Sequence, residues 1–402
     1  MTIVVLLILA GITISLVFSE NGIIAKAREA AEKTNQAVIN EQAQMNELID
    51  YMGNMLNEIG GGSTPEEPEK PIVPESWDTE KVNPVLSEDD QYVPVPKGYT
   101  ASEATGENTV ENGFVIYENT NGEDKDEPVT DESDIKTAQE TRNQFVWVPV
   151  ANPSDMYGTD SSGKKWGKLW NFSSTGITAI NWTEQDGKMT ITDDTNFREP
   201  DVIDEDSSNS VTITKLETEF NNMIASIEKY GGFYIGRYET GNLNQEEAVV
   251  VKNNDDIANQ TWYTQYQKSK EIAANSNVTS TMIWGCQWDA VMRWMYNSGN
   301  EDKKTYTYDS TGKGNYEGEQ GNLYKIIPTG SDNKYYINNI YDMAGNVGEW
   351  TVETVNNLYR TTRGYYRFNA TGIDSPAATR NYESTTISAD DVGSRSTLYI
   401  NI

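Results

Sequence analysis

The chemistry available to this sequence is concentrated in one short segment, residues 341–351. The segment carries a carboxylate near each end, Asp342 and Glu349, with glycines between them that free the backbone to turn. Calcium takes oxygen ligands in a flexible geometry, and such a loop offers two carboxylates and the carbonyl groups between them. The segment therefore predicts a calcium-binding loop, and the alternative is a metal-free loop closed by hydrogen bonds.

The residues that the chain lacks exclude several kinds of site. Histidine is absent, which removes the commonest general base near neutral pH and the commonest transition-metal ligand. Cys286 is the one cysteine, so neither an intrachain disulfide nor a Cys-plus-His zinc site can form. The formal net charge is −31, whereas a nucleic-acid interface needs basic clusters. We expect no nucleic-acid partner.

The first element along the chain is an uncharged apolar run, residues 3–18. With its flanking residues the run approaches the length of a membrane-spanning helix. A secretory signal peptide would begin with basic residues and end at a small-residue cleavage site, but no Lys or Arg precedes Lys26. The run therefore predicts a retained helix that contacts the membrane, with a cleaved signal peptide as the alternative.

A second helix is predicted over residues 21–59, which lack proline and are rich in Ala, Glu, Gln and Lys. Its apolar residues recur every three or four positions and form one stripe. The stripe consists of Met45, Leu48, Met52, Met55 and Ile59. It predicts self-association with copies of the same helix; the alternative is packing against the chain's own globular domain.

Residues 60–84 form a Gly/Pro/Glu-rich linker, flexible at its triple glycine and stiffened by the prolines that follow. Residues 85–402 then show short β-like runs between polar turns, which predicts a domain of the α+β class. The expected elements are strands within 113–117, 144–149 and 232–238, helices over 216–230 and 288–296, and a long insertion within 153–215.

Residues 342–351, Asp-Met-Ala-Gly-Asn-Val-Gly-Glu-Trp-Thr, resemble the DMAGNVWEWT signature of the formylglycine-generating-enzyme, or sulfatase-modifying-factor, family. Weaker motifs follow the family's order and extend the resemblance over residues 140–402. They lie at 145–149, 232–239, 282–294, 363–365 and 392–395. The resemblance implies a C-type-lectin-like fold with irregular insertions. It also implies that the Gly345 and Val347 carbonyls join Asp342 and Glu349 around calcium, with Asn346 bracing the loop.

The same resemblance bears on catalysis. The family's oxidising enzymes bind copper through two cysteines, but residues 363–395 contain none, so we expect no copper and no catalysis. The family's iron-dependent branch would need histidines that are absent here. Cys286 is expected to be a buried, inert thiol. An enzyme of the formylglycine-generating type stays as an alternative.

Two structural expectations accompany these motifs. Arg237 and Glu239 lie two residues apart in a predicted strand, so they would share one face and form a structural polar pair. Four tryptophans are expected to pack in the core, because large aromatic side chains dominate cores. They are Trp284, Trp288, Trp294 and Trp350.

Residues 2–14 and 21–30 resemble the apolar helix and following polar helix of type IV pilin-like proteins of Gram-positive bacteria. Those proteins begin with a basic leader and a glycine cleavage site, and often carry a glutamate near the mature start. None of these precedes Thr2. We therefore expect either a truncated or misplaced start, or a plain membrane anchor descended from pilins.

Residues 356–391 are rich in Tyr, Arg, Asn, Ser and Thr, the types that form recognition surfaces. The alternative is an ordinary polar loop region. The candidate ligand-binding residues are Tyr359, Arg363, Tyr365, Tyr366, Arg367, Asn369, Arg380, Asn381 and Tyr382. In place and composition the segment resembles the diversified region of variable proteins from diversity-generating retroelements, which belong to the same fold group.

Together these features predict a non-catalytic adhesion protein, displayed on the surface or on a pilus of a Gram-positive bacterium. Its ligand would be a protein or a glycan on another cell or surface, and display of many copies would raise weak binding through avidity. The alternative is a structural minor pilin subunit.

Overall fold

The computed structural model describes residues 71–120, 132–185, 188–191, 211–273, 275–317, 325–355, 358–365 and 371–402. The chain divides into two compact units, Met1–Lys70 and Pro71–Ile402, and this boundary falls within the predicted linker. The helices predicted over residues 1–59 lie outside the described ranges. Within those ranges, no helix has the length and apolar character needed to cross a membrane.

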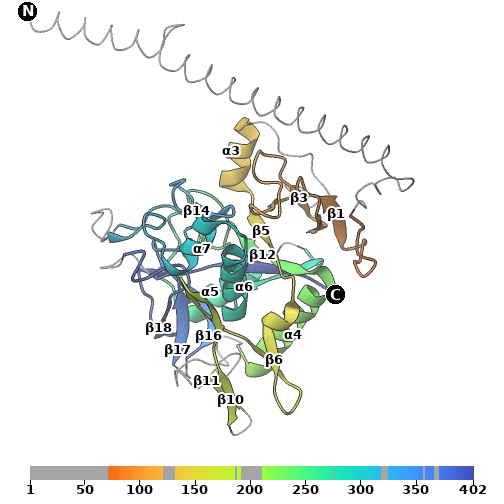
Figure 1. The fold of residues 1–402 in the computed structure, drawn as a ribbon. Coiled ribbons are helices and arrows are strands. Elements are labelled where there is room, and N and C mark those ends of the chain that lie inside the picture. Colours follow the sequence, from red (N-terminus) through yellow and green to blue (C-terminus); the bar gives the residue numbers. More distant parts are fainter. Residues whose placement is uncertain are drawn as a thin grey trace, which may run out of the picture. The chain divides into compact units, whose positions relative to one another are not determined.

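The second unit has a mixed α+β architecture in which strands outnumber helices (Figure 1). Its larger sheet has six strands in the order β13-β20-β12-β5-β4-β3, and every pairing is antiparallel. The strands are β3 (Tyr99–Ala101), β4 (Val115–Glu118), β5 (Gln144–Pro149), β12 (Gly232–Gly236), β13 (Val278–Met282) and β20 (Ser396–Ile400). The central strands β12 and β20 are buried along their whole length, so this sheet carries the core. The three predicted strands are therefore confirmed.

The described residues contain five α-helices. They are α3 (Glu132–Thr141), α4 (Ile213–Tyr230), α5 (Trp262–Glu271), α6 (Gly285–Tyr296) and α7 (Glu301–Tyr308). The α4 helix begins after Thr212, whose hydroxyl accepts the Lys215 amide at 3.2 Å, and it ends at Gly231, whose φ of 84° is left-handed. Both predicted helices, within α4 and α6, are confirmed, whereas α3, α5 and α7 were not expected.

A smaller sheet contains two strands of the predicted recognition segment, one from each half of it. Its strands are β16 (Gly348–Thr354), β17 (Tyr359–Arg363), β18 (Arg380–Ser384) and β19 (Val392–Ser394), in the order β18-β17-β16-β19. The β16–β19 pair is parallel and the other two pairs are antiparallel. This order leaves β18 at an edge of the sheet.

The other strands in the described ranges form five small antiparallel hairpins. They pair β1 (Val82–Leu86) with β2 (Tyr92–Pro96), β6 (Tyr157–Thr159) with β7 (Lys165–Gly167), β8 (Trp170–Ser173) with β9 (Gly176–Ala179), β10 (Trp182–Gln185) with β11 (Lys188–Ile191), and β14 (Tyr336–Ile337) with β15 (Ile340–Tyr341). Three of these hairpins lie in the segment where we expected an insertion, and β10–β11 projects from the body of the unit (Figure 1).

The aromatic core agrees with most of the sequence expectations. Trp284, Trp288 and Trp350 are fully buried, and Cys286 is 1% exposed. Trp294 differs, because it is only half-buried and packs at the margin of the core.

The expected pairing of Arg237 with Glu239 is wrong. The Arg237 guanidinium binds the buried Glu107 carboxylate and donates to Gln144 Oε1 at 3.1 Å. Glu239 instead accepts from Asn346 Nδ2 at 2.8 Å. The reason is that β12 ends at Gly236, so the strand alternation that would pair the two side chains does not reach them.

Candidate functional site

The signature loop, residues 341–351, is closed by hydrogen bonds. The Asn346 side chain makes several of them: its Oδ1 accepts from Ile327 N and from Asn315 Nδ2, each at 3.1 Å, and its Nδ2 donates to Glu239. Asp342 and Asn346 both adopt positive φ, a conformation that Asn and Asp tolerate better than most residues. Asn346 thus braces the loop, as expected.

The loop's carboxylates do not fit the calcium site that we expected at Asp342, Gly345, Val347 and Glu349. Arg395 binds both oxygens of Glu349, with Nε at 2.8 Å from Oε2, and both side chains are buried. Asp342 Oδ2 accepts from the Gly330 amide at 2.7 Å and from the Thr329 hydroxyl at 3.0 Å. A guanidinium therefore occupies the position of a cation beside Glu349. Among the described residues, no group of three acidic or Cys side chains is placed to hold a metal ion.

Burial is the main cause of the raised pKa values of the carboxyl groups in and beside this loop. It raises the pKa of Asp342 to about 6, and it raises the pKa of Glu349 to about 6 despite the opposing effect of Arg395. Burial together with the Asp342 and Glu349 charges raises the pKa of Glu239 well above its usual range. The Asp342 Oδ1 and Glu239 Oε1 atoms are buried and find no hydrogen-bond partner among the residues that the structure describes. The cluster is therefore a site where protonation and folding are linked.

A second buried charge cluster lies beneath the β17–β18 hairpin. Arg363 Nη2 contacts Asp289 Oδ1 at 2.7 Å, and Arg363 Nη1 contacts Glu353 Oε2 at 3.4 Å. Arg380 contacts the other oxygen of each carboxylate, with Nε at 2.9 Å from Glu353 Oε1. We call these four residues the Arg/acid quartet. It is neutral overall and ties α6 and β16 to the hairpin.

The quartet corrects part of the expected ligand-binding set. Arg363 is fully buried and Arg380 nearly so, and their charges are satisfied within the quartet, so they support the hairpin instead of meeting a ligand. Tyr359 and Asn381 are half-buried and Tyr382 is exposed. Tyr365 is half-buried, has a φ of 57° and packs against the core. Tyr366, Arg367 and Asn369 lie outside the described residues.

The exposed end of the β17–β18 hairpin presents large side chains to solvent. Tyr359 and Tyr382 meet edge to face with ring centroids 5.5 Å apart. Leu358 is 59% exposed, Tyr382 47% and Ile387 48%. The Thr385 amide donates to the Leu358 carbonyl at 3.0 Å, which brings the chain on both sides of the hairpin together. We call Leu358, Tyr359, Tyr382 and Ile387 the Tyr382 patch.

Sequence reasoning missed two members of this patch. Leu358 and Ile387 are isolated apolar residues in polar surroundings, a pattern that does not distinguish a core position from an exposed one. It also missed Asp289 and Glu353, which belong to the quartet. The tyrosine-rich composition of the segment was the feature that identified its location.

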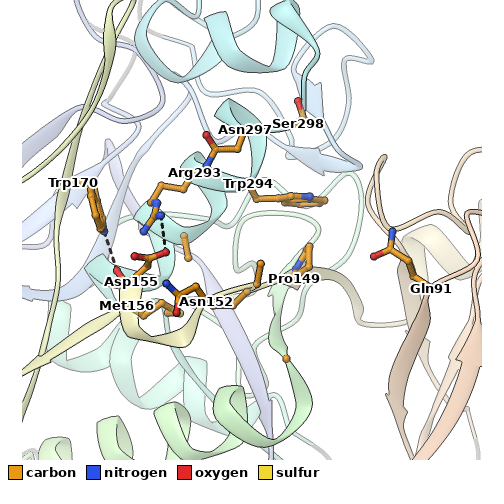
Figure 2. Close-up of a pocket in the computed structure, with 14 residues that line it drawn as sticks. Gln91, Pro149, Asn152, Asp155, Met156, Trp170, Arg293, Trp294, Asn297 and Ser298 are labelled. Carbon is orange, nitrogen blue, oxygen red and sulfur yellow. Dashed lines mark hydrogen bonds and ion pairs between the residues drawn. The ribbon is translucent and has the colours of Figure 1, made fainter. Parts of the chain in front are cut away.

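Two cavities lie on other parts of the second unit. One, of about 480 Å³, is lined by residues of α6, of 149–156 and of the β1–β2 connection, together with Trp170 and Gly231 (Figure 2). The other, of about 520 Å³, is lined mainly by polar residues of 105–112, 300–313 and 333–339. Neither cavity includes a residue of the Tyr382 patch.

No family model matches the chain, and no curated protein matches it. Among solved structures, one titled "Crystal Structure of CarF" is 13% identical, with a TM-score of 0.32; the match covers 42% of this chain and 87% of that one. "Treponema denticola variable protein 1" is also 13% identical, with a TM-score of 0.23 and coverage of 63% and 95% respectively. Both likenesses are too weak to assign a fold.

Proposed function

We propose that this chain is a non-catalytic recognition protein that binds a protein ligand through the Tyr382 patch. The proposal rests on two features of the β17–β18 hairpin. Its end carries the exposed Tyr382, packed against the half-buried Tyr359, together with the exposed Leu358 and Ile387, and the Arg/acid quartet holds the two strands in place. Large apolar side chains that gather at the surface mark interaction sites. Tyrosine supplies contact area at low entropic cost.

The rigidity of the hairpin supports the same proposal. Ordering side chains and loops on association costs free energy, so a preorganised surface binds more tightly than a mobile one. Here Arg363 and Arg380 are each held by two carboxylates, and Arg360 donates to the Val352 carbonyl at 2.8 Å. The strand that carries Tyr382 is thereby fixed to β16 and α6.

The sequence supports a non-catalytic role on the C-type-lectin-like fold that we propose for residues 85–402. Neither the copper-binding cysteine pair nor the histidine ligands of the resembled family can be assembled from this sequence. Cys286 is buried in the core, where its thiol packs as a small apolar group.

We further propose that the recognition unit is displayed at a bacterial cell surface. The apolar run at residues 3–18 would contact the membrane, and the stripe within 45–59 would allow self-association. Display of several copies raises the overall affinity for a surface. Once one copy is bound, a neighbouring copy meets its ligand at a high effective concentration.

We also propose that the codons of the segment that carries the Tyr382 patch are diversified among sibling clones. If the codons of this segment are diversified, substitutions among sibling clones will fall at Tyr359, Asn381 and Tyr382, which reach the surface. They will spare Arg360 and Arg363, which are buried. Sequencing the 3′ end of the gene in sibling clones tests this. Uniform clones, or changes concentrated at the buried arginines, would contradict it.

The class of ligand is tested by binding of the fluorescently labelled full chain to a panel of neighbouring and host cells. We expect saturable binding that is lost when the target cells are treated with protease and kept when they are treated with glycosidases. Loss with glycosidases alone, or no saturable binding to any cell, would contradict the proposed function.

A further inference from the structure

The cavity beside α6 has the properties of a second binding site. Its volume of about 480 Å³ lies within the ~300–1,000 Å³ range of small-molecule pockets. Its walls come from segments that are far apart in the sequence: the C-terminal half of α6 with the residues after it, residues 149–156, Trp170 of β8, Gly231, and Gln91 of the β1–β2 connection (Figure 2). It shares no residue with the Tyr382 patch, so the side chains that would contact a ligand here differ from those of the proposed function.

One wall of the cavity is an aromatic platform. Trp294 points from α6 into the space bounded by Pro149 and Gln91 (Figure 2). Trp294 is only half-buried. By contrast, Trp284, the N-cap residue of α6, and Trp288, within the same helix, are fully buried. An amphipathic indole that faces a cavity presents an apolar ring to a ligand and a polar N–H at its edge.

The rim of the cavity carries neutral carboxamides. Asn297 is exposed and makes no side-chain hydrogen bond within the described residues. Asn152 is also exposed and accepts from the Ser154 hydroxyl at 2.9 Å. Gln91, across the cavity, donates to Asp89 at 3.3 Å. Each carboxamide offers both donors and an acceptor, a combination that matches hydroxyl groups.

The charges in the cavity cancel. Arg293 Nη2 contacts Asp155 Oδ2 at 2.8 Å, and the Arg293 guanidinium lies 4.1 Å from the centre of the Trp170 ring. The Trp170 indole donates to the Asp155 carbonyl at 3.0 Å, which fixes the ring in place. A ligand entering this cavity meets a compensated ion pair, so neither an anion nor a cation gains a free partner here.

We propose that this cavity binds a neutral sugar ring. The C–H face of a pyranose would stack on Trp294, and its hydroxyl groups would bond to Asn152, Asn297 and the Asp155–Arg293 pair. A purely apolar ligand would leave the carboxamides desolvated without partners, which costs free energy. A hydroxylated ring with one apolar face can stack on the indole and also form hydrogen bonds with the carboxamides.

The site is connected to the recognition hairpin through Trp170. Its amide donates to Asp289 Oδ2 at 2.7 Å, and its carbonyl accepts from Arg380 Nη1 at 3.1 Å. The residue that closes one side of the cavity therefore also contacts the quartet beneath β18. The two sites are adjacent, but their ligand-contacting side chains differ.

The test uses the full chain and soluble probes: methyl glycosides of glucose, galactose, mannose and N-acetylglucosamine, their β1→4 disaccharides, uridine and indole. Saturation-transfer NMR and tryptophan fluorescence would report binding. We expect at least one glycoside to bind with a Kd near ~1 mM, a weak affinity of about −4 kcal/mol. Uridine and indole should bind more weakly than that glycoside.

Variants then locate the binding. Trp294→Ala should weaken glycoside binding by ~10-fold or more, about 1.4 kcal/mol, and Trp294→Phe, which keeps a ring, should weaken it less. Asn297→Ala should weaken it several-fold. The matched control Asn171→Ala, an exposed asparagine of β8 outside the cavity, should have no effect, and neither should Tyr382→Ala.

Three outcomes would overturn the inference. The first is that no glycoside binds at ~50 mM, some fifty times the expected Kd. The second is that binding survives Trp294→Ala in a protein whose melting curve shows that it is folded. The third is that uridine or indole binds more tightly than every glycoside. Because Tyr382→Ala leaves this site intact, failure here is distinguishable from failure of the proposed protein recognition.

Discussion

Arg363 and Arg380 lie directly opposite each other on β17 and β18, and both guanidinium groups bind the same two carboxylates, Asp289 and Glu353. Like charges opposite each other on a sheet are ordinarily destabilising. Here each guanidinium contacts one oxygen of Asp289 and one oxygen of Glu353. The two arginines and two carboxylates therefore form a closed, neutral cluster under the hairpin. The arrangement holds the tyrosine-bearing edge strand in one position.

Breaking this cluster should destabilise the second unit strongly. Arg363→Met keeps apolar volume but leaves Asp289 and Glu353 buried with one guanidinium between them. We expect a loss of about 3–5 kcal/mol in the free energy of unfolding, the usual cost of removing one partner from a buried ion pair. Urea denaturation of the full chain, followed by tryptophan fluorescence, measures the change.

The matched control for this variant is Asn381→Ala, one residue from Arg380 on the same strand but half-buried and outside the quartet. Its effect should stay within about 0.5 kcal/mol, as for most surface substitutions. Equal effects of the two variants would contradict a supporting role for the quartet.

The buried Asp342 predicts a defined dependence of stability on pH. Its pKa is about 6 in the folded protein and 3.8 in its ordinary state, so the folded protein binds this proton more tightly than the unfolded chain does. The contribution is therefore fully present below pH 3.8 and is lost as pH rises through about 6.

Asp342→Asn should remove that contribution and keep an oxygen that accepts from Thr329 and Gly330. The fall in unfolding free energy between about pH 4 and pH 7 should become smaller by about 1–3 kcal/mol. Urea midpoints at several pH values measure this. The exposed Glu247→Gln variant should keep the wild-type slope, and an unchanged slope in Asp342→Asn would refute the prediction.

The Arg395–Glu349 pair predicts that calcium does not stabilise the protein. Because the guanidinium occupies both carboxylate oxygens, calcium and chelator should give the same melting temperature. Glu349→Gln should cost about 3–5 kcal/mol, since it leaves the buried Arg395 charge uncompensated. A rise in melting temperature with calcium that disappears in Asp342→Asn would restore the calcium interpretation.

The sequence predicted local elements better than long-range pairings. The α4 helix was predictable because its apolar residues Phe220, Met223, Ile224 and Ile227 follow a helical period, and all four are buried. The α5 helix was missed because its buried residues mix aromatic and polar types and show no apolar period. They are Trp262, Tyr263, Gln265, Tyr266 and Ser269, and the aromatic residues among them equally suit a strand.

The candidate site shows where local patterns cease to help. Arg363 meets Asp289, 74 residues earlier, and Arg237 meets Glu107, 130 residues earlier. Nothing in the local sequence identifies these partners among many acidic residues. For the same reason the calcium expectation could not anticipate Arg395, which lies 46 residues beyond Glu349. The tyrosine-rich composition indicated a recognition surface, but the fold decides which of its residues reach solvent.

Recognition through the Tyr382 patch is tested most directly by comparing two single-tyrosine variants of the labelled full chain in the cell-binding assay. Tyr382 and Tyr336 are 47% and 40% exposed, and Tyr336 lies on the separate β14–β15 hairpin. Tyr382→Ala should weaken binding by ~10-fold or more, as for an aromatic residue central to an interface. Tyr336→Ala should bind like the wild-type protein. Wild-type binding by Tyr382→Ala, or equal losses in both variants, would contradict the account.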